Sequence, residues 1–322
     1  MSFRTSRRHH MLGLLAASLA PELLWAQGTW PTKPINVIVP FAPGGAGNGS
    51  VRILAEIIGP KIGQPMVVEN RPGAGGITGT ASVVSSNDDH TLLLGSTTMT
   101  ILPALRNDLG YDVQRDLQPV GMISTQPLVL AVATSSPLRK LEDLVAKGRS
   151  GELSAGNSGV GTLSHLTTEL FNRKLGTRIL AVPYKGDSVL IPDVVAGTIS
   201  MGVMNLPVAL PLIQAGRLRA LAVTSAQPIA SLPGVAVLRS LGDEFVISGW
   251  AALFAAKKVP AAGVARLDKL LREALDTAPV RERFASFGVT PEASTPDQLR
   301  DFVRSETTRW ADVVRSAGIK LE

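Results

Sequence analysis

Cysteine is absent from this chain of 322 residues, and histidine is scarce, with four in total. Without cysteine there is no disulfide, no thiol chemistry and no cysteine-based metal site. A chain of this length can bury a sufficient core without such cross-links. Outside the N-terminal leader only His90 and His165 are present, far apart in sequence. A transition-metal site is therefore disfavoured, and we expect no metal and no cofactor. His90 follows acidic residues in a turn and is expected at the surface.

Clustered basic charge is also missing. The formal net charge is +6, and the leader carries three arginines and one glutamate, so the rest of the chain has a charge of +4. No run of lysine and arginine is interleaved with aromatic residues, which make up only 4% of the chain. Nucleic acid is therefore not an expected partner. A mildly positive surface favours small anionic molecules.

The first 26 residues are typical of a cleavable signal peptide. Basic residues including Arg7 and Arg8 precede an apolar run, Met11–Ala20, and Ala26 is a small residue at the expected cleavage point. The apolar run is shorter than the roughly 20 residues that a membrane span needs. Ser6-Arg7-Arg8 also resembles a twin-arginine signal, so the Sec and twin-arginine routes both stay open. Either route predicts a periplasmic protein.

Short β-branched apolar runs alternate with helical patterns along the chain. Such alternation predicts an α/β fold with parallel sheets covered on both faces. The expected strands are residues 35–40, 66–69, 91–95, 120–124, 128–132, 179–182, 199–203 and 218–223, and the expected helices are 51–62, 76–85, 138–147, 164–175, 187–196, 208–215, 264–278 and 295–317.

Two long extended apolar segments, residues 120–132 and 246–256, indicate how the chain is divided. Two such crossings allow one domain to be inserted into another, with a cleft and a hinge between them. We therefore expect a first lobe built from residues 27–124 and 247–322, and a second lobe built from residues 125–246. Residues 1–26 are assigned to the signal peptide.

A glycine-rich stretch, Pro43–Asn48, joins the first expected strand to the first expected helix. Free N–H groups and the positive end of a helix meet there, which predicts an anion site. Phosphate motifs fail elsewhere: Asn157 replaces the lysine of a P-loop after Gly151–Gly156, and Thr78 replaces the third glycine of a dinucleotide fingerprint. We do not expect a nucleotide.

A serine hydrolase was the main catalytic alternative. Gly156–Val160 lacks the final glycine of a nucleophile turn. His165 follows Ser164 directly on an expected helix, where adjacent side chains point apart. The remaining polar features, Ser158–His165 at a helix start and Gly95–Thr98 after a buried strand, are donors and not catalysts. The residues at the helix start can serve simply as an N-cap, or they can also hold a carboxylate at the ends of parallel strands; both interpretations stay open.

Several motifs together resemble one family. They run in order through nearly the whole chain after the leader: Trp30-Pro31, Val39-Pro40-Phe41, Pro43-Gly44-Gly45, Val68–Gly76, Leu92–Gly95, Ser164-His165-Leu166, Val182–Gly186, Leu206-Pro207, Gly216–Thr224, Leu253–Ala255 and Ala317–Lys320. This order is similar to that of the Bug-type extracytoplasmic solute receptors of tripartite tricarboxylate transporters, the TctC group.

The resemblance implies a non-catalytic, monomeric periplasmic receptor with a fold like the type II periplasmic binding proteins, in which two lobes close on a small carboxylate. Integral-membrane transporter subunits are the implied partners, and a sensing role is the alternative. The implied ligand-binding residues are Phe41, Gly44, Gly45, Asn48, Ser96, Thr97, Thr98, Ser158, Gly161, Thr162, Ser164, His165, Tyr184, Lys185, Gly186, Met204 and Asn205.

Two positions depart from the family pattern. Asn48 and Met204 each stand where the family usually has aspartate. An aspartate can pair with a ligand ammonium or cap a loop, whereas asparagine can only cap and methionine can do neither. The departures predict a ligand without an amino group; the alternative is that they are neutral changes at capping positions.

Overall fold

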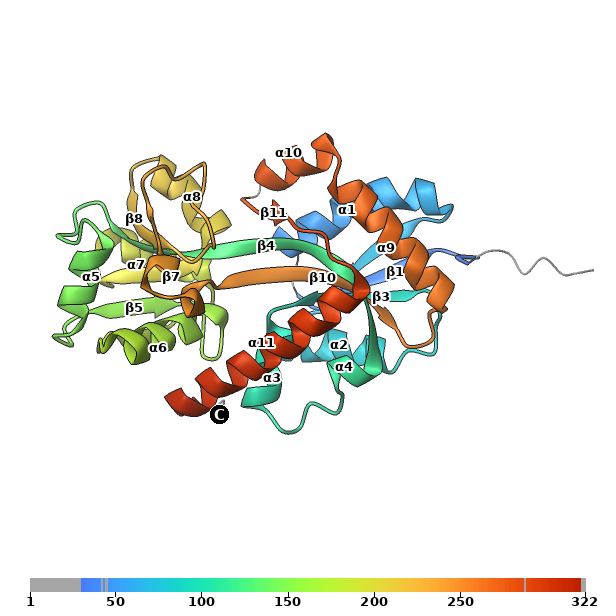
Figure 1. The fold of residues 1–322 in the computed structure, drawn as a ribbon, viewed down its shortest axis with the longest axis horizontal. Helices are drawn as coiled ribbons and strands as arrows, with labels where there is room; N and C mark the ends of the chain where they lie inside the picture. The colour runs from blue at the N-terminus through green and yellow to red at the C-terminus, as the bar shows by residue number, and fades with distance from the viewer. Residues whose placement is uncertain (1–29, 42, 44–45, 287, 320–322) are drawn as a thin grey trace, which may run out of the picture.

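The computed structural model describes residues 30–41, 43, 46–286 and 288–319 (Figure 1). The signal peptide expected over residues 1–26 lies outside this part, as do Gly44 and Gly45. None of the helices in the described ranges combines the length and apolarity that a membrane crossing needs.

The first lobe is built on three parallel strands in the order β2-β1-β3, each followed by a helix. This part confirms the expected alternation. Its elements are β1 (Ile35–Val39), α1 (Ala46–Ile62), β2 (Met66–Asn70), the 3-10 turn η1 (Ala74–Gly76), α2 (Ile77–Val84), β3 (Thr91–Ser96), α3 (Thr98–Leu105) and α4 (Val113–Asp116).

The second lobe repeats this plan with three parallel strands in the order β7-β5-β6. Its elements are α5 (Leu141–Gly148), β5 (Ser154–Asn157), α6 (Leu163–Leu175), β6 (Leu180–Pro183), α7 (Asp187–Ala196), β7 (Met201–Asn205), α8 (Leu206–Gln214), β8 (Leu218–Val223), β9 (Ala236–Val237), and the 3-10 turns η2 (Leu238–Leu241) and η3 (Asp243–Phe245). Sequence patterns missed the short strand β5, which contains Gly156.

Two long strands, β4 (Leu117–Ala133) and β10 (Ser248–Ala256), run side by side between the lobes (Figure 1). The two extended segments expected over 120–132 are thus one strand, which at about 3.3 Å per residue spans about 55 Å. The expectation of purely parallel sheets was wrong. β4 and β10 are antiparallel to each other, β10 is antiparallel to β3, and β4 is antiparallel to β7 and β8, because a chain that crosses and returns must reverse direction.

The C-terminal part adds α9 (Ala261–Leu275), α10 (Ala278–Ser286), β11 (Thr290–Pro291) and α11 (Pro296–Ala317). Helix α11 starts with a capping box, in which Thr295 and Gln298 each bond the other's backbone N–H. Figure 1 shows this helix running obliquely from the first lobe toward the second.

The buried apolar residues form one cluster in the first lobe and two clusters on the two faces of the second-lobe sheet. The second half of α11 joins the second lobe, because Trp310, Val313 and Val314 pack with Phe171 and Phe245 there. Its first half, through Leu299 and Val303, packs in the first-lobe core. Helix α11 therefore ties the lobes together beside β4 and β10, and the exact lobe boundaries stay a prediction.

Helix α1 begins at Ala46, five residues before its expected start. A side chain at Gly47 would lie 3.4 Å from Leu94 and 3.6 Å from Ala251. These are ordinary contact distances, so the first turn of α1 packs against β3 and β10 with room for a Cβ. Tertiary packing outweighs the low helix propensity of glycine here.

Candidate ligand-binding site

The strand registers bring the predicted binding segments of the two lobes to facing edges. Ser96, at the end of β3, pairs with Ala251, which pairs with Ser124 of β4. Asn205, at the end of β7, pairs with Leu128 of the same strand. The two strand ends are therefore offset by four positions along β4, which is about 13 Å in the strand direction. This spacing suits a small molecule held between helix N-termini of both lobes.

The first-lobe edge contains a relay of side chains at the start of α1. Asn48 Oδ1 accepts a hydrogen bond from Arg52 Nε at 2.8 Å. Arg52 Nη2 donates to Asn70 Oδ1 at 2.9 Å, and Asn70 Nδ2 donates to the Phe41 carbonyl at 2.8 Å. Asn48 was expected to cap the loop but lies inside the first turn of α1, because that helix starts early. The relay instead links the exits of β1 and β2 to the helix.

The three hydroxyl residues that end β3 have different roles. Ser96 Oγ and Thr98 Oγ1 lie 3.0 Å apart, and both side chains are partly exposed. Thr97 is 7% exposed, and its Oγ1 accepts a hydrogen bond from the Trp250 backbone N–H at 3.1 Å. Ser96 and Thr98 can therefore meet a ligand, whereas Thr97 joins β3 to β10.

The second-lobe edge has its donors around the first turn of α6. Thr162 Oγ1 accepts from the His165 N–H at 3.4 Å and donates to the Gly159 carbonyl at 2.7 Å. The Gly161 N–H donates to His165 Nδ1 at 3.0 Å. The N–H groups of the first helical turn have no acceptor within the helix. This turn is therefore ready to hold an anion.

Asp187 is the functional candidate that sequence analysis missed. Its carboxylate accepts from Ser158 Oγ, and from the backbone N–H and Nδ2 of Asn205 at 3.1 and 2.8 Å. Ser158 Oγ also accepts from Ser164 Oγ at 3.3 Å. Asp187 thus joins the ends of β5 and β7 to the starts of α6 and α7. Asp187 could have been identified from the sequence as an acidic residue in the first turn of an expected helix.

The segment after β6 frames the same edge. The Tyr184 N–H donates to the Asn157 carbonyl at 2.9 Å, and the Gly186 N–H donates to the Ser158 carbonyl at 3.2 Å. Tyr184 Oη donates to Asp193 at 2.7 Å; burial and this carboxylate raise the pKa of Tyr184. Lys185 is exposed. These contacts hold the segment, and only Lys185 presents a charge outward.

Met204 does not lie with the other predicted site residues. Its side chain is fully buried in a core cluster with Leu190 and Val194. Adjacent residues of a strand point to opposite faces, so Met204 enters the core while Asn205 reaches Asp187. The argument that residue 204 selects the ligand is therefore not supported by its position.

Serine and histidine are not arranged for nucleophilic catalysis at this edge. His165 Nδ1 accepts from a backbone N–H, and its Nε2 lies 3.8 Å from Glu169. The Ser158 and Ser164 hydroxyls bond Asp187 and each other. A nucleophile needs a base within hydrogen-bond reach, and these serines have no imidazole partner in the described site.

Burial shifts the pKa of both members of the His165–Glu169 pair. It lowers the pKa of His165 and raises the pKa of Glu169. We expect Glu169→Gln to raise the thermal unfolding midpoint by about 1–2 °C near neutral pH. A carboxyl group whose pKa is raised by folding contributes its full stabilisation of the folded state below its unfolded pKa of 4.5. It loses that contribution as the pH rises through its folded pKa. Glutamine avoids this loss.

Thermal unfolding of the wild-type protein and of Glu169→Gln, measured from neutral pH down to pH 4.5, checks the prediction. The gain should shrink as pH falls toward 4.5. An equal gain at all pH values, or a loss at neutral pH, would contradict it.

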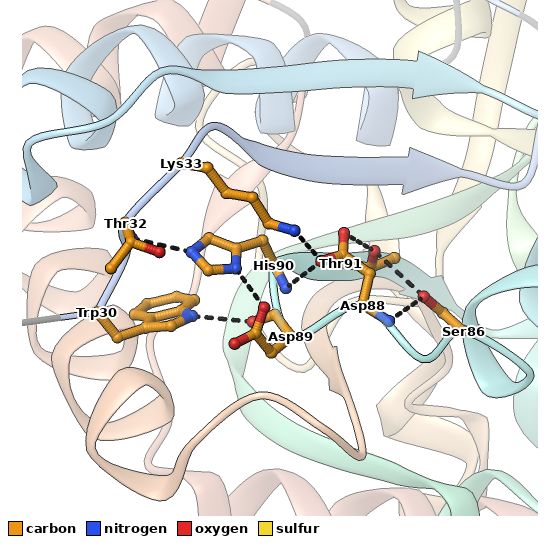
Figure 2. Close-up of polar contacts among 8 residues, drawn as sticks. All are labelled: Trp30, Thr32, Lys33, Ser86, Asp88, Asp89, His90 and Thr91. Atoms are coloured by element: carbon orange, nitrogen blue, oxygen red, sulfur yellow. Dashed lines mark hydrogen bonds and ion pairs between the residues drawn. The ribbon is translucent and has the colours of Figure 1, made fainter. Parts of the chain in front are cut away.

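Asp88, Asp89 and His90 form a cluster of metal-ligating types at the start of β3. Figure 2 shows that these groups bond to the protein: His90 Nε2 accepts from the Thr32 N–H at 3.0 Å, His90 Nδ1 lies 2.6 Å from Asp89, and Asp88 pairs with Lys33 at 2.8 Å. His90 is 1% exposed, so its expected surface position was wrong. The cluster fastens the segment before β1 to β3, and both ring nitrogens are already engaged.

Two cavities are present outside the hydroxyl-bearing strand ends, one on each lobe. One, of about 880 Å³, is lined by residues that include Ser135, Leu138 and Lys147 in the second lobe. The other, of about 650 Å³, lies along α1 and β2 and is lined by residues that include Arg52, Glu56 and Met66. Neither contains the hydroxyl-bearing residues of the predicted site.

Two α/β lobes joined by crossing strands, with helix N-termini at facing strand ends, define a periplasmic solute-binding protein, and solved structures of this class resemble the chain. The R. palustris protein Rpa4515 with adipate is 30% identical with a TM-score of 0.80, covering 91% of this chain and all of that one. MatC from Rhodopseudomonas palustris with bound malate is 29% identical with a TM-score of 0.75, covering 88% of this chain and 99% of that one.

Residues 50–319 match the tripartite tricarboxylate transporter family receptor, TctC. Protein BugT of Bordetella pertussis is 38% identical over 318 residues, which are 97% of this chain and 98% of BugT. The chain belongs to this receptor family, and the resemblance seen in its motifs is confirmed. The family is one of binding proteins, and it implies an exported, periplasmic protein with a small-molecule ligand.

Proposed function

We propose that the protein captures a small carboxylate between its lobes and delivers it to a tripartite tricarboxylate-type transporter. The observation that carries this is the meeting of helix N-termini and hydroxyl donors from both lobes across four residues of β4. A ligand that contacts both edges favours the closed arrangement, since it stabilises that state selectively. The protein acts by binding, without catalysis, after export by a cleavable signal.

The ligand we propose lacks an amino group. Asn48 offers no negative charge at the first-lobe edge. At the second-lobe edge, both oxygens of Asp187 already accept hydrogen bonds, and the residue is 8% exposed. A ligand ammonium has no free carboxylate to meet among these residues. Di- and tricarboxylic acids and aromatic acids fit this donor-rich site.

A thermal shift screen of purified protein tests the function. Adipate, malate, citrate and benzoate are compared with aspartate and glutamate. A ligand at about 100 times its dissociation constant should raise the unfolding midpoint by about 5 °C or more. Stabilisation by aspartate or glutamate, with none from the plain acids, would contradict the proposed ligand class. Native mass spectrometry of freshly purified protein identifies a retained ligand.

Uptake of the labelled best ligand separates transport from sensing. A strain lacking this protein should lose uptake and regain it on complementation. Unchanged uptake would favour a sensing role.

A further inference from the structure

The guanidinium of Arg52 bonds only neutral oxygen atoms. Its Nε donates to Asn48 Oδ1 at 2.8 Å, and its Nη2 donates to Asn70 Oδ1 at 2.9 Å and to the Val68 carbonyl at 3.4 Å. Within the described ranges, no carboxylate forms an ion pair with it. Its positive charge is therefore not compensated by a direct neighbour.

Other arginines on the same side of this lobe are neutralised. Arg71 pairs with Glu69 at 2.7 Å, and Arg283 pairs with Glu56 at 2.9 Å. Glu56 is one helical turn after Arg52 and was the natural partner for it, but it is engaged by α10. Arg52 therefore keeps an uncompensated charge where Arg71 and Arg283 do not.

This charge lies close to the first-lobe edge of the candidate site. Arg52 is six residues from Ala46, the first residue of α1, which is about 9 Å along the helix. Side chains on a helix lean toward its N-terminus, which shortens that distance. The relay through Asn70 to the Phe41 carbonyl also holds the guanidinium near the exit of β1.

We propose that Arg52 makes the receptor select ligands by their negative charge, and that Asn48 permits this by orienting Arg52 without neutralising it. The inference rests on the proposed carboxylate-binding function. If the guanidinium and a ligand charge are taken to be about 9–10 Å apart, Coulomb's law at the dielectric constant of water gives about a twofold change in affinity for each ligand charge. A dicarboxylate therefore gains about fourfold to fivefold, and a monocarboxylate about twofold.

Residue 48 provides the sharpest variant. Asn48→Asp changes the side-chain volume little and places a carboxylate against Arg52 Nε. Arg52→Gln removes the charge, and Arg52→Lys keeps it while losing the planar contacts. Lys61→Gln is the matched control, because it removes one positive charge at the opposite end of the same helix. The double variant Asn48→Asp/Arg52→Gln tests whether the two residues act through one another.

Isothermal titration calorimetry measures these proteins against pairs of equal chain length: succinate and butyrate, glutarate and pentanoate, adipate and hexanoate. We expect Asn48→Asp and Arg52→Gln each to weaken dicarboxylate binding about fivefold at low salt and monocarboxylate binding about twofold. The losses should shrink in high salt, since screening acts on exposed charges. Arg52→Lys and Lys61→Gln should retain wild-type selectivity. The double variant changes the local charge by two units, so it should lose about the sum of the single losses, because Coulomb energies add.

Four results would overturn the inference: unchanged affinities in both Asn48→Asp and Arg52→Gln, equal losses for both members of a pair, the same loss in Lys61→Gln, or a double variant that loses no more than either single variant. Each of these leaves the proposed function standing, because the wild-type protein binds. If the wild-type protein binds none of these acids, the proposed function and this inference fail together. Should Arg52→Gln not fold, the near-isosteric Asn48→Asp decides alone.

Discussion

Replacing Gly79 with alanine is expected to destabilise the protein by about 2 kcal/mol. Gly79 lies in helix α2, where alanine is ordinarily favoured over glycine by about 1 kcal/mol. A Cβ at this position would lie 2.7 Å from the Arg71 carbonyl oxygen and 2.8 Å from Pro40 Cα. Backbone atoms cannot rotate away as a side chain can, so overpacking of about 1–3 kcal/mol or more outweighs the helix preference.

The same substitution should also weaken ligand binding, because Pro40 and Arg71 follow the ends of β1 and β2 at the first-lobe edge. Urea unfolding measures the free energy of unfolding. Gly59→Ala in helix α1 is the matched control, since its nearest contact is an ordinary 3.4 Å. That control should be neutral or slightly stabilising. Equal effects of the two substitutions would show that helix propensity, and not the close backbone approach, controls stability here.

Asp187→Ala should produce the second large effect, a loss of about 3 kcal/mol in the free energy of unfolding. The carboxylate is 8% exposed and accepts from the Ser158 hydroxyl and from two donors of Asn205. Alanine leaves these donors without an acceptor in a largely buried place, and hydrogen bonds to a charged group contribute about 1.5–3 kcal/mol each. It also removes a negative charge from the first turn of α7, where the helix dipole favours one.

Carboxylate affinity should fall at least tenfold in the same variant, because Ser158 and Asn205 lose the group that orients them. Asp193→Ala is the comparison: Asp193 accepts one hydrogen bond from Tyr184 and is partly exposed, so its loss should be about 1 kcal/mol or less. Chemical denaturation and calorimetric titration are applied to both. An Asp187→Ala protein with normal stability and affinity would show that the network does not position the site.

The order of strands and helices and the donor-rich segments were predictable from local patterns. The parallel strands of the first lobe and the donors around Ser158 and Thr162 follow from short windows of sequence, whereas β5 of the second lobe was missed. Hydrophobic periodicity and capping depend on residues a few positions apart, so one window contains the needed information.

The errors arose where distant segments decide the outcome. Glycines near Gly47 predicted a loop, but α1 begins at Ala46, and its first turn lies beside Leu94 and Ala251. Met204 and Asn205 were treated as one site segment, although the strand sends them to opposite faces.

Sequence alone determined that this protein belongs to a family of exported receptors and that its strand ends are rich in donors suited to anions. Only the tertiary structure decided which strand ends face each other, that Asp187 joins Ser158 to Asn205, and that Arg52 bonds no carboxylate among the described residues. The physical reason is that strand register and ion pairing depend on residues that are far apart in the sequence. The distance between the two edges depends on how β3, β10 and β7 align along β4, and the charge of Arg52 depends on Glu56 being taken by α10.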